Sequence, residues 1–299
     1  MNTLTISDLY KSFGEKQVLR GFSMEVPEHS IFGFVGKNGA GKTTVMKTVL
    51  GLLRADQGEI EVEGTRVVFG ETKTNRFVGY LPDVPEFYPF MTAKEYLNLC
   101  GECLGMDRLQ IRNRSGELLE LVGLAKETTK IKGFSRGMKQ RLGIAQALLG
   151  SPKLLICDEP TSALDPIGRK EILDILQSVK DRTTVLFSTH ILSDVERICT
   201  DAAFLHEGRI VMQGNVSSLK SLRQERIFTV ETATPSAAQA LQGQFPAARN
   251  PQADTLCFTG GEDLMNAVLT HLASNQLPLR RIEWEEPSLE SIFMEVASK

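Results

Sequence analysis

The stretch Gly36-Lys-Asn-Gly-Ala-Gly-Lys-Thr-Thr44 stands directly after the apolar segment Ile31-Phe-Gly-Phe-Val35. The order of these two segments predicts a strand, a tight loop and then a helix. Two glycines five positions apart, followed by lysine and threonine, have the spacing of a phosphate-binding loop. Because glycine has no Cβ, backbone N–H groups can approach phosphates closely, and the positive end of the helix points at the same anion. Residues 36–44 therefore predict nucleotide binding on an α/β fold.

Several residues of this loop are candidate ligands. Lys42 would reach the β and γ phosphates, and the hydroxyl of Thr43 would hold Mg²⁺. The other loop positions that would surround the phosphates are Gly36, Asn38, Gly39, Ala40, Gly41 and Thr44. The alternative is a glycine-rich turn that only begins a helix. A chance match to the pattern in this length has a probability on the order of one per cent, so phosphate binding is favoured.

A pair of carboxylates follows a second apolar segment. Residues 153–157 predict a buried strand, and Asp158 and Glu159 follow it directly. Beside a phosphate-binding loop, Asp158 would bind Mg²⁺ through water, and Glu159 would polarise the water that attacks the γ-phosphate. A solvated turn is the commoner role of such a pair in general. The phosphate-binding loop in the same domain favours the catalytic role here.

The order of the predicted elements indicates a first domain of the α/β class over residues 1–219, with a mixed β core. Residues 3–35 show short alternating apolar segments separated by turns, which is typical of strands. Residues 84–150 are expected to form a helical subdomain, because the apolar period is helical over most of them. Further elements are expected as a helix at 42–53, strands at 59–62, 67–69 and 77–81, a helix at 168–179, a strand at 184–187, a helix at 192–198, and strands at 202–205 and 209–212. Strands that alternate with helices indicate a largely parallel sheet covered on both faces.

A second, smaller domain is expected over residues 222–299, after the charged segment 220–226. Its predicted elements are a strand at 226–232, a helix at 235–243, two strands around 250–254, a helix at 262–274, a strand at 279–284 and a helix at 288–297. Apart from the last helix, this order matches the split β-α-β arrangement of ferredoxin-like domains. The sequence therefore predicts an α+β ferredoxin-like C-terminal domain.

Composition excludes several classes of protein. The chain has 299 residues, 41 % hydrophobic and 24 % charged, and a formal charge of −3. These values are ordinary for a globular protein and give no electrostatic footprint for nucleic acid. No apolar run approaches the roughly 18 residues of a membrane helix, and the start of the chain lacks the basic and apolar regions of a signal peptide. We therefore expect a cytosolic location and no nucleic-acid partner.

The five cysteines are widely spread and mostly in apolar surroundings, so we expect them to be reduced. Cys100 and Cys103 have the spacing of a metal or redox site. They stand in a helical pattern without a second pair or a nearby histidine. Structural or incidental thiols are therefore favoured over a metal site.

The stretch Phe134-Ser-Arg-Gly-Met-Lys-Gln-Arg141 stands shortly before the carboxylate strand. Together with the two motifs above, it resembles the signature of the ATP-binding subunits of ABC transporters, and the resemblance extends over most of residues 4–219. Ser135 and Gly137 match the family pattern, whereas Phe134, Arg136 and Met138 depart from its commonest form. At a helix start, Ser135 and Gly137 can present a hydroxyl and N–H groups to a phosphate. The resemblance implies the fold of a P-loop ATPase cassette.

The resemblance implies roles for other positions. His190, at a strand end, resembles the histidine that contacts the γ-phosphate. Residues 162–165, SALD, resemble the segment that crosses the dimer interface of the family. Phe13 resembles the aromatic residue that stacks on adenine, with Val18 nearby, although ordinary packing of Phe13 is an open alternative.

Asp83 departs from the family pattern, which usually has glutamine after the strand that ends in Gly-Tyr-Leu-Pro. A carboxylate there resembles some exporter subunits of the ABC-2 type and of lantibiotic immunity, as do residues 80–97 and the ending Pro287–Val296. We expect Asp83 to face Mg²⁺ or its bound water. A solvated loop carboxylate is the alternative.

By resemblance, the chain is expected to be the ATPase subunit of an exporter, on the cytoplasmic face of the membrane beneath a separate transmembrane permease. One copy of each motif implies a pair of such subunits with two Mg-ATP at their interface. The loop 82–90 and the helical subdomain would face the permease. The alternative is an ABC ATPase that acts on nucleic acid, ribosomes or cofactor assembly. Members of that kind usually carry two cassettes or long coiled coils, which this sequence lacks.

Overall fold

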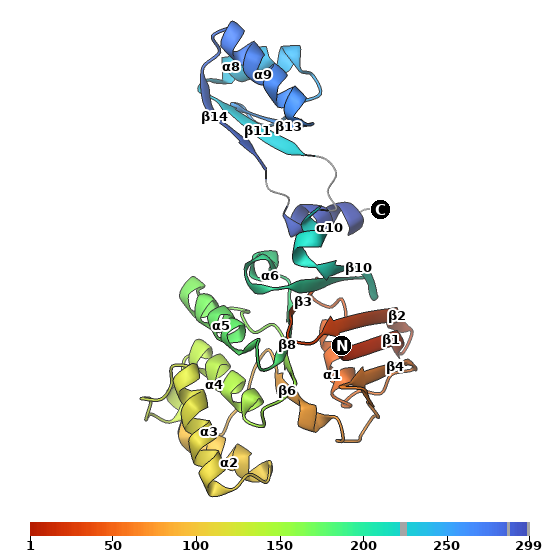
Figure 1. The fold of residues 1–299 in the computed structure, drawn as a ribbon, viewed down its shortest axis with the longest axis vertical. Coiled ribbons are helices and arrows are strands. Elements are labelled where there is room, and N and C mark those ends of the chain that lie inside the picture. The colour runs from red at the N-terminus through yellow and green to blue at the C-terminus, as the bar shows by residue number, and fades with distance from the viewer. Residues whose placement is uncertain (222–225, 286–287, 298–299) are drawn as a thin grey trace. The chain divides into compact units, whose positions relative to one another are not determined.

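The computed structural model of the chain describes residues 1–221, 226–285 and 288–297. It divides into two compact units, Met1–Val216 and Ser217–Lys299 (Figure 1). Residues 222–225, where the second domain is predicted to begin, lie outside the described residues, as do residues 286–287 and 298–299. No helix in the part of the chain that the structure describes is both long and apolar enough to cross a membrane.

The first unit contains a six-stranded sheet in the order β10-β9-β3-β8-β7-β6. Its strands are β3 (Ile31–Gly36), β6 (Val78–Leu81), β7 (Leu154–Cys157), β8 (Thr184–Thr189), β9 (Asp201–His206) and β10 (Arg209–Asn215). The strands β6, β7, β8, β3 and β9 each run parallel to their neighbours in the sheet, whereas β10 pairs antiparallel with β9. Every residue of β3, β7 and β8 is buried, as expected for parallel strands covered on both faces. The predicted, largely parallel sheet is confirmed.

A second, antiparallel sheet of the first unit has the order β2-β1-β4-β5. Its strands are β1 (Asn2–Phe13), β2 (Lys16–Pro27), β4 (Gln57–Val62) and β5 (Thr65–Arg66). The predicted strand at 67–69 is wrong, because β5 ends at Arg66 and the side chains of Val68 and Phe69 are exposed. The apolar pattern there reflects a surface loop and not a strand.

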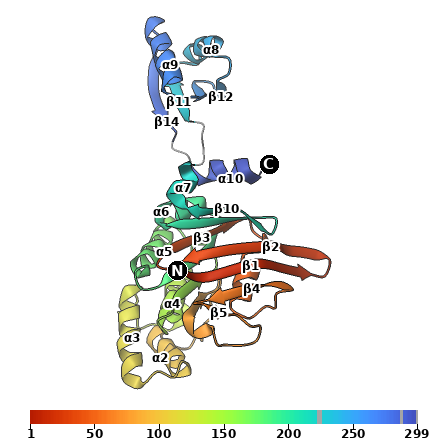
Figure 2. The same ribbon diagram turned by 45° about the vertical axis from the view of Figure 1, so that its right-hand side comes forward.

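Two apolar cores lie on opposite faces of the six-stranded sheet, since alternate side chains of a strand point to opposite sides. Phe32, Phe34 and Leu186 pack with α1 (Lys42–Val49) and the antiparallel sheet. Their strand neighbours Val185 and Phe187 belong to the other core, with α4 (Arg136–Leu148), α5 (Pro166–Val179) and α6 (Leu192–Ile198). Figure 2 shows these helices and the antiparallel sheet on either side.

The helix α1 ends earlier than the predicted residue 53, at Val49. Gly51 follows with a φ of 68°. Its N–H group bonds to the Thr48 carbonyl at 3.0 Å, and the N–H group of Leu52 bonds to the Lys47 carbonyl at 2.9 Å. This is the hydrogen-bond pattern of a glycine-terminated helix, so the glycine stops the helix although apolar residues continue beyond it.

The helical subdomain consists of α2 (Ala93–Cys103), α3 (Arg108–Leu121) and α4, with a short 3₁₀ turn at Ile131–Gly133; a second 3₁₀ turn, Asn75–Phe77, directly precedes β6. Thr92 and Glu95 form a capping box at the start of α2, and Asp107 and Gln110 form one at the start of α3. Such reciprocal caps satisfy the free N–H groups of a helix start and explain why both helices begin where they do.

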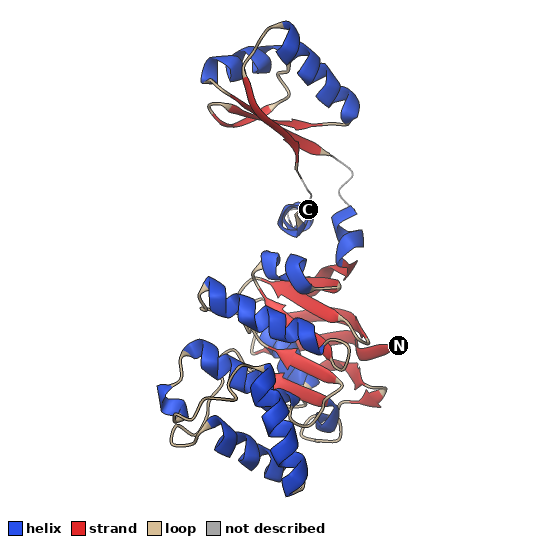
Figure 3. Ribbon diagram, turned by 60° about the vertical axis from the view of Figure 1, so that its left-hand side comes forward, coloured by secondary structure: helices blue, strands red, loops and turns tan. Residues whose placement is uncertain are grey.

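The second unit has a four-stranded antiparallel sheet in the order β12-β13-β11-β14. Its elements are α7 (Val216–Ser221), β11 (Ile227–Thr232), α8 (Pro235–Gln244), β12 (Arg249–Gln252), β13 (Thr255–Thr259), α9 (Glu262–Ser274), β14 (Leu279–Trp284) and α10 (Leu289–Ala297). Figure 3 shows α8 and α9 on one face of the sheet, where Leu241 and Val268 pack on Phe228 and Leu256. The strand order is that of the predicted ferredoxin-like domain. The short helix α7 was not predicted.

Candidate functional site

A cavity of about 380 Å³ lies where several strands of the six-stranded sheet end. The loops that follow β3, β6, β7 and β8 meet there, because parallel strands present their carboxyl ends at the same edge of a sheet. The cavity is lined by Val18, Asn38, Gly39, Gly41, Lys42, Thr43, Thr44, Asp83, Asp158, Glu159, Ser162 and His190. All but Ser162 are predicted site residues.

Lys42 is held inside the glycine-rich loop. Its Nζ donates to the carbonyl oxygen of Gly36 at 2.6 Å and to that of Lys37 at 3.3 Å, and its side chain is only 6 % exposed. The loop closes around it because Gly41 has a φ of 115°, and a Cβ there would lie 3.1 Å from Cγ1 of Val18. The backbone carbonyl groups of the loop therefore hold the ammonium group in place, near the start of α1.

Asp158 is buried and accepts two hydrogen bonds that hold its carboxylate. The hydroxyl of Thr43 donates to Oδ2 at 2.7 Å, and the hydroxyl of Ser188 donates to Oδ1 at 2.6 Å. No motif in the sequence indicates a role for Ser188. A signal exists, because it is a hydroxyl side chain within the buried strand β8, next to the strand that carries the carboxylates.

Glu159 has a left-handed backbone, with a φ of 49°. Such a conformation costs a non-glycine residue on the order of 1–3 kcal/mol and persists where the surroundings enforce it. Its N–H group donates to the hydroxyl of Ser188 at 2.9 Å. Oε1 lies 3.0 Å from Nζ of Lys42, and Oε2 lies 2.8 Å from Nδ1 of His190. The carboxylate thus stands between an ammonium group and an imidazole on the cavity wall.

Asp83 follows β6 and reaches the same cavity from another side. Nη2 of Arg136 lies 3.4 Å from Oδ1 of Asp83. Partial burial raises the pKa of this carboxyl, as do the nearby charges of Asp158 and Glu159, whereas Arg136 lowers it. The carboxyl is therefore placed among negative groups with one cation beside it.

Other predicted site residues do not line this cavity. Gly36 contributes its carbonyl to Lys42, and Ala40 packs at the edge of the core. Phe13 ends β1 and is half exposed, with Nζ of Lys11 5.4 Å from its ring centre. Ser135 caps α4 by accepting the N–H group of Met138 at 3.2 Å, and Gly137 lies in the first turn. The structure places both of these away from the cavity of their own chain.

The donor set of the cavity fits Mg²⁺. A threonine hydroxyl and a carboxylate, already hydrogen-bonded to each other, are the hard oxygen ligands that this ion prefers, and it usually takes few of them together with phosphate oxygens. Thr43 and Asp158 would therefore hold the ion, whereas a contact of Asp83 with the ion or its water stays a prediction. Within the described residues, no group of three or more His, Cys, Asp or Glu side chains forms a metal cluster of its own.

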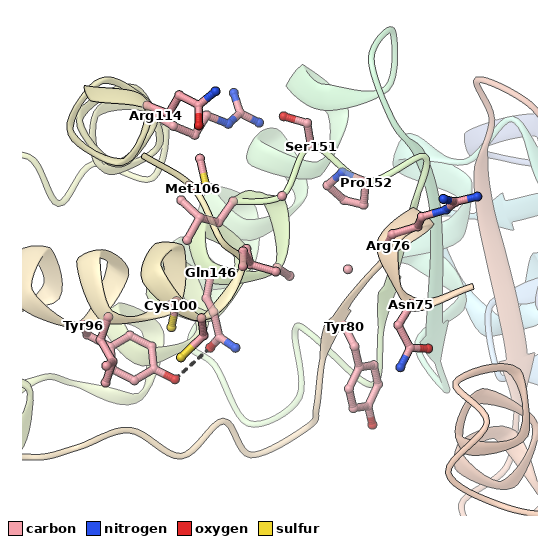
Figure 4. A pocket seen from close by; sticks show the side chains of 18 of the residues that line it. Asn75, Arg76, Tyr80, Tyr96, Cys100, Met106, Arg114, Gln146, Ser151 and Pro152 are labelled. Carbon is pink, nitrogen blue, oxygen red and sulfur yellow. Dashed lines mark hydrogen bonds between the residues drawn. The ribbon is translucent and has the colours of Figure 1, made fainter. Parts of the chain in front are cut away.

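A larger cavity, of about 1170 Å³, lies between β6 and the helices α2, α3 and α4. Figure 4 shows Tyr96 at one end, where its hydroxyl donates to Gln146 at 3.1 Å, and Arg114 at another. Burial raises the pKa of Tyr80 to about 12 and also raises the pKa of the Cys100 thiol. Cys100 and Cys103 are free thiols on this wall. The glycine-rich loop, Asp158 and Glu159 do not line this cavity, so its lining differs from that of the first.

Comparison with known proteins gives two family matches. The family model described as ABC transporter matches residues 19–162, and the model described as the C-terminal domain of DrrA1-3-like ATP-binding proteins matches residues 214–297. The chain is 36 % identical to the uncharacterized ABC transporter ATP-binding protein YxlF of Bacillus subtilis (strain 168), over 98 % of this chain and 99 % of that protein. It is 35 % identical to the bacitracin transport ATP-binding protein BcrA of Bacillus licheniformis, over 97 % and 95 %.

A solved structure of the ATP binding subunit of an ABC transporter is also similar to this chain. It is 31 % identical in sequence, has a TM-score of 0.67, and covers 74 % of this chain and 92 % of its own. The similarity therefore includes both the sequence and the fold.

Proposed function

Because this chain belongs to the family of ABC transporter ATP-binding proteins and is an ATPase of that family, we propose that it powers an exporter through a separate transmembrane permease, with Mg²⁺ as the metal of its ATP site. The observation that carries this proposal is the position of Glu159 between Lys42 and His190, beside the Thr43–Asp158 pair. It supplies a phosphate-binding cation and a water-orienting carboxylate in one cavity.

The side chains of the cavity have complementary tasks in ATP hydrolysis. Lys42 and the N–H groups of the glycine-rich loop bind the phosphates. When the ammonium group of Lys42 binds a phosphate oxygen in place of Glu159, Oε1 of Glu159 can accept a hydrogen bond from the attacking water. Glu159 then orients that water and His190 holds the other oxygen of the carboxylate. Mg²⁺, when held by Thr43 and Asp158, supplies positive charge against the phosphates.

A second copy of the chain is part of the proposal. Ser135 and Gly137 begin α4, where N–H groups and the positive end of a helix favour an anion. They do not line their own cavity. We infer that they contact the ATP held by a second subunit, so that two subunits enclose two ATP molecules.

The permease would contact the surface around the larger cavity. The loop 82–90 beside it exposes Val84, Tyr88 and Phe90, with 63 %, 52 % and 64 % of their surface accessible. Tyr88 also lines the cavity. The ring centres of Tyr88 and Phe90 lie 5.7 Å apart, and exposed apolar side chains that gather on a surface often mark a contact with another protein. The subunit would then work on the cytoplasmic face of the membrane, where ATP is available.

Isolation of the tagged chain in a gentle detergent tests this function. A multispan membrane protein is expected to copurify, and Phe90→Ala together with Tyr88→Ala should reduce its recovery. The matched control is Leu269→Ala, which removes an exposed apolar side chain of α9 in the other unit. Recovery of ribosomes or nucleic acid in place of a membrane protein would favour the alternative class of ABC ATPase.

A further inference from the structure

Two side chains of α4 contact Asp83, which stands on a different element. Nε2 of Gln140 donates a 2.7 Å hydrogen bond to the carbonyl oxygen of Asp83, and Nη2 of Arg136 lies 3.4 Å from its carboxylate. Gln140 and Arg136 are four residues apart, so they share one face of the helix. Gln140 is completely buried, whereas the side chains of Arg136 and Asp83 are 45 % and 46 % exposed. The backbone of Asp83 is thus fixed while its carboxylate keeps access to solvent.

Asp83 borders two hollows at once. It lines the nucleotide cavity together with Asp158 and Glu159. It also lines a neighbouring hollow of about 420 Å³, together with Arg136 and Lys132. A carboxylate turned toward the first hollow would repel the phosphates of ATP, because like charges at short range destabilise each other. Turned toward the second hollow, it meets the guanidinium group of Arg136.

We propose that Arg136 is a positioning residue that holds the Asp83 carboxylate of its own subunit away from the phosphates, so that ATP enters a less negative cavity. Gln140 fixes the backbone from which that carboxylate extends. Arg136 lies between Ser135 and Gly137, the residues assigned above to the ATP of a second subunit. The first turn of α4 would therefore act on the ATP site of its own subunit through Arg136 and on that of the second subunit through Ser135 and Gly137. That the ligand is ATP rests on the proposed function.

Equilibrium binding of ATP, measured in EDTA and again with Mg²⁺, tests the proposal. Arg136→Ala is expected to weaken ATP binding in EDTA about threefold, which is the effect expected of a partly exposed ion pair. The loss should be smaller with Mg²⁺, because the metal reduces the phosphate charge. Arg136→Lys should keep most of the affinity, since it keeps the positive charge.

A double-mutant cycle separates positioning from a general effect of charge. In an Asp83→Asn background, Arg136→Ala should change ATP binding little, because no carboxylate remains to be held. The matched control is Lys132→Ala, which removes a neighbouring exposed cation for which the described residues show no ion pair with Asp83. An equal loss in both backgrounds, or an equal loss with Lys132→Ala, would overturn the proposal.

Mixed dimers decide whether Arg136 acts in its own subunit. A Lys42→Ala subunit paired with an Arg136→Ala subunit leaves one working phosphate loop, which lies in the Arg136→Ala chain and faces an intact signature. If Arg136 acts on Asp83 of its own chain, the KM for Mg-ATP of this pair should exceed that of Lys42→Ala with wild type, by less than the roughly threefold loss expected in EDTA. Equal KM values would show that Arg136 does not act on the ATP site of its own subunit and would overturn the proposal. If Lys42→Ala with wild type is itself inactive, one intact site is insufficient for hydrolysis, and the binding cycle decides the role of Arg136.

Discussion

The hydroxyl of Ser188 donates a 2.6 Å hydrogen bond to Oδ1 of Asp158 across two neighbouring parallel strands. The same hydroxyl accepts the backbone N–H group of Glu159 at 2.9 Å. One buried side chain of β8 therefore fixes both the carboxylate assigned to the metal and the left-handed backbone of the carboxylate assigned to water.

Ser188→Ala is expected to lower kcat and to raise the Mg²⁺ concentration needed for half-maximal ATPase activity. The substitution leaves a buried carboxylate oxygen and a partly buried N–H group without a partner, which costs about 1–3 kcal/mol in stability. Thr3→Val is the control, because it removes a buried hydroxyl bond to Thr184, far from the cavity in sequence and outside its lining. Both variants should lose stability, measured by urea unfolding. Equal Mg²⁺ dependence in the two would contradict the role of Ser188.

Lys42→Ala should lose ATP binding, whereas Glu159→Gln should bind ATP and stall its hydrolysis. Removal of the lysine deletes a buried cation that would contact phosphate, and the second change deletes only the negative charge that would orient water. Size-exclusion chromatography with ATP is the measurement, and Glu159→Gln should elute as a trapped dimer. A wild-type hydrolysis rate in Glu159→Gln would rule out the role assigned to this carboxylate.

Mixtures of Lys42→Ala and Ser135→Arg chains should regain ATPase activity that neither chain has alone. If sites are shared, one site of a mixed dimer carries both changes and the other carries none. Activity is measured against the mixing ratio, with formation of mixed dimers checked by two different tags. Mixed dimers as inactive as either parent would argue against shared sites or would show that one intact site is insufficient.

A chain that ends after Ser221 should still bind Mg-ATP, because every residue that lines the nucleotide cavity precedes residue 191. The second unit has its own core around Phe228 and Phe258, which stack at 4.9 Å. Its removal should therefore change dimer affinity or regulation and not the cavity. Fluorescence binding of an ATP analogue checks this, and a folded truncation that cannot bind would contradict the predicted boundary at residues 219–222.

Elements with an uninterrupted apolar period were predicted closely from sequence. The helices at 192–198 and 262–274 and the strand at 279–284 have the predicted bounds. The errors lie where apolar residues are not part of a regular element. At 67–69 they form a surface loop, and at Leu52 they continue past a helix that Gly51 ends. Hydrophobic periodicity cannot separate these cases, because it records side-chain polarity and not backbone hydrogen bonds.

The sequence by itself determined the chemistry of the cavity, because each motif is local. A role in nucleotide binding follows from the spacing of glycine, lysine and threonine in residues 36–44, and a catalytic role follows from the adjacent Asp158 and Glu159. Neither prediction needs knowledge of the fold. Tertiary structure decided which side chains act together. Thr43 contacts Asp158, 115 residues further along the chain. The contacts of Ser188 with Asp158 and of Arg136 with Asp83 were not predicted from any motif. The physical reason is that the pairing of parallel strands brings distant loops to one edge of the sheet, and this pairing is set by the packing of the whole core.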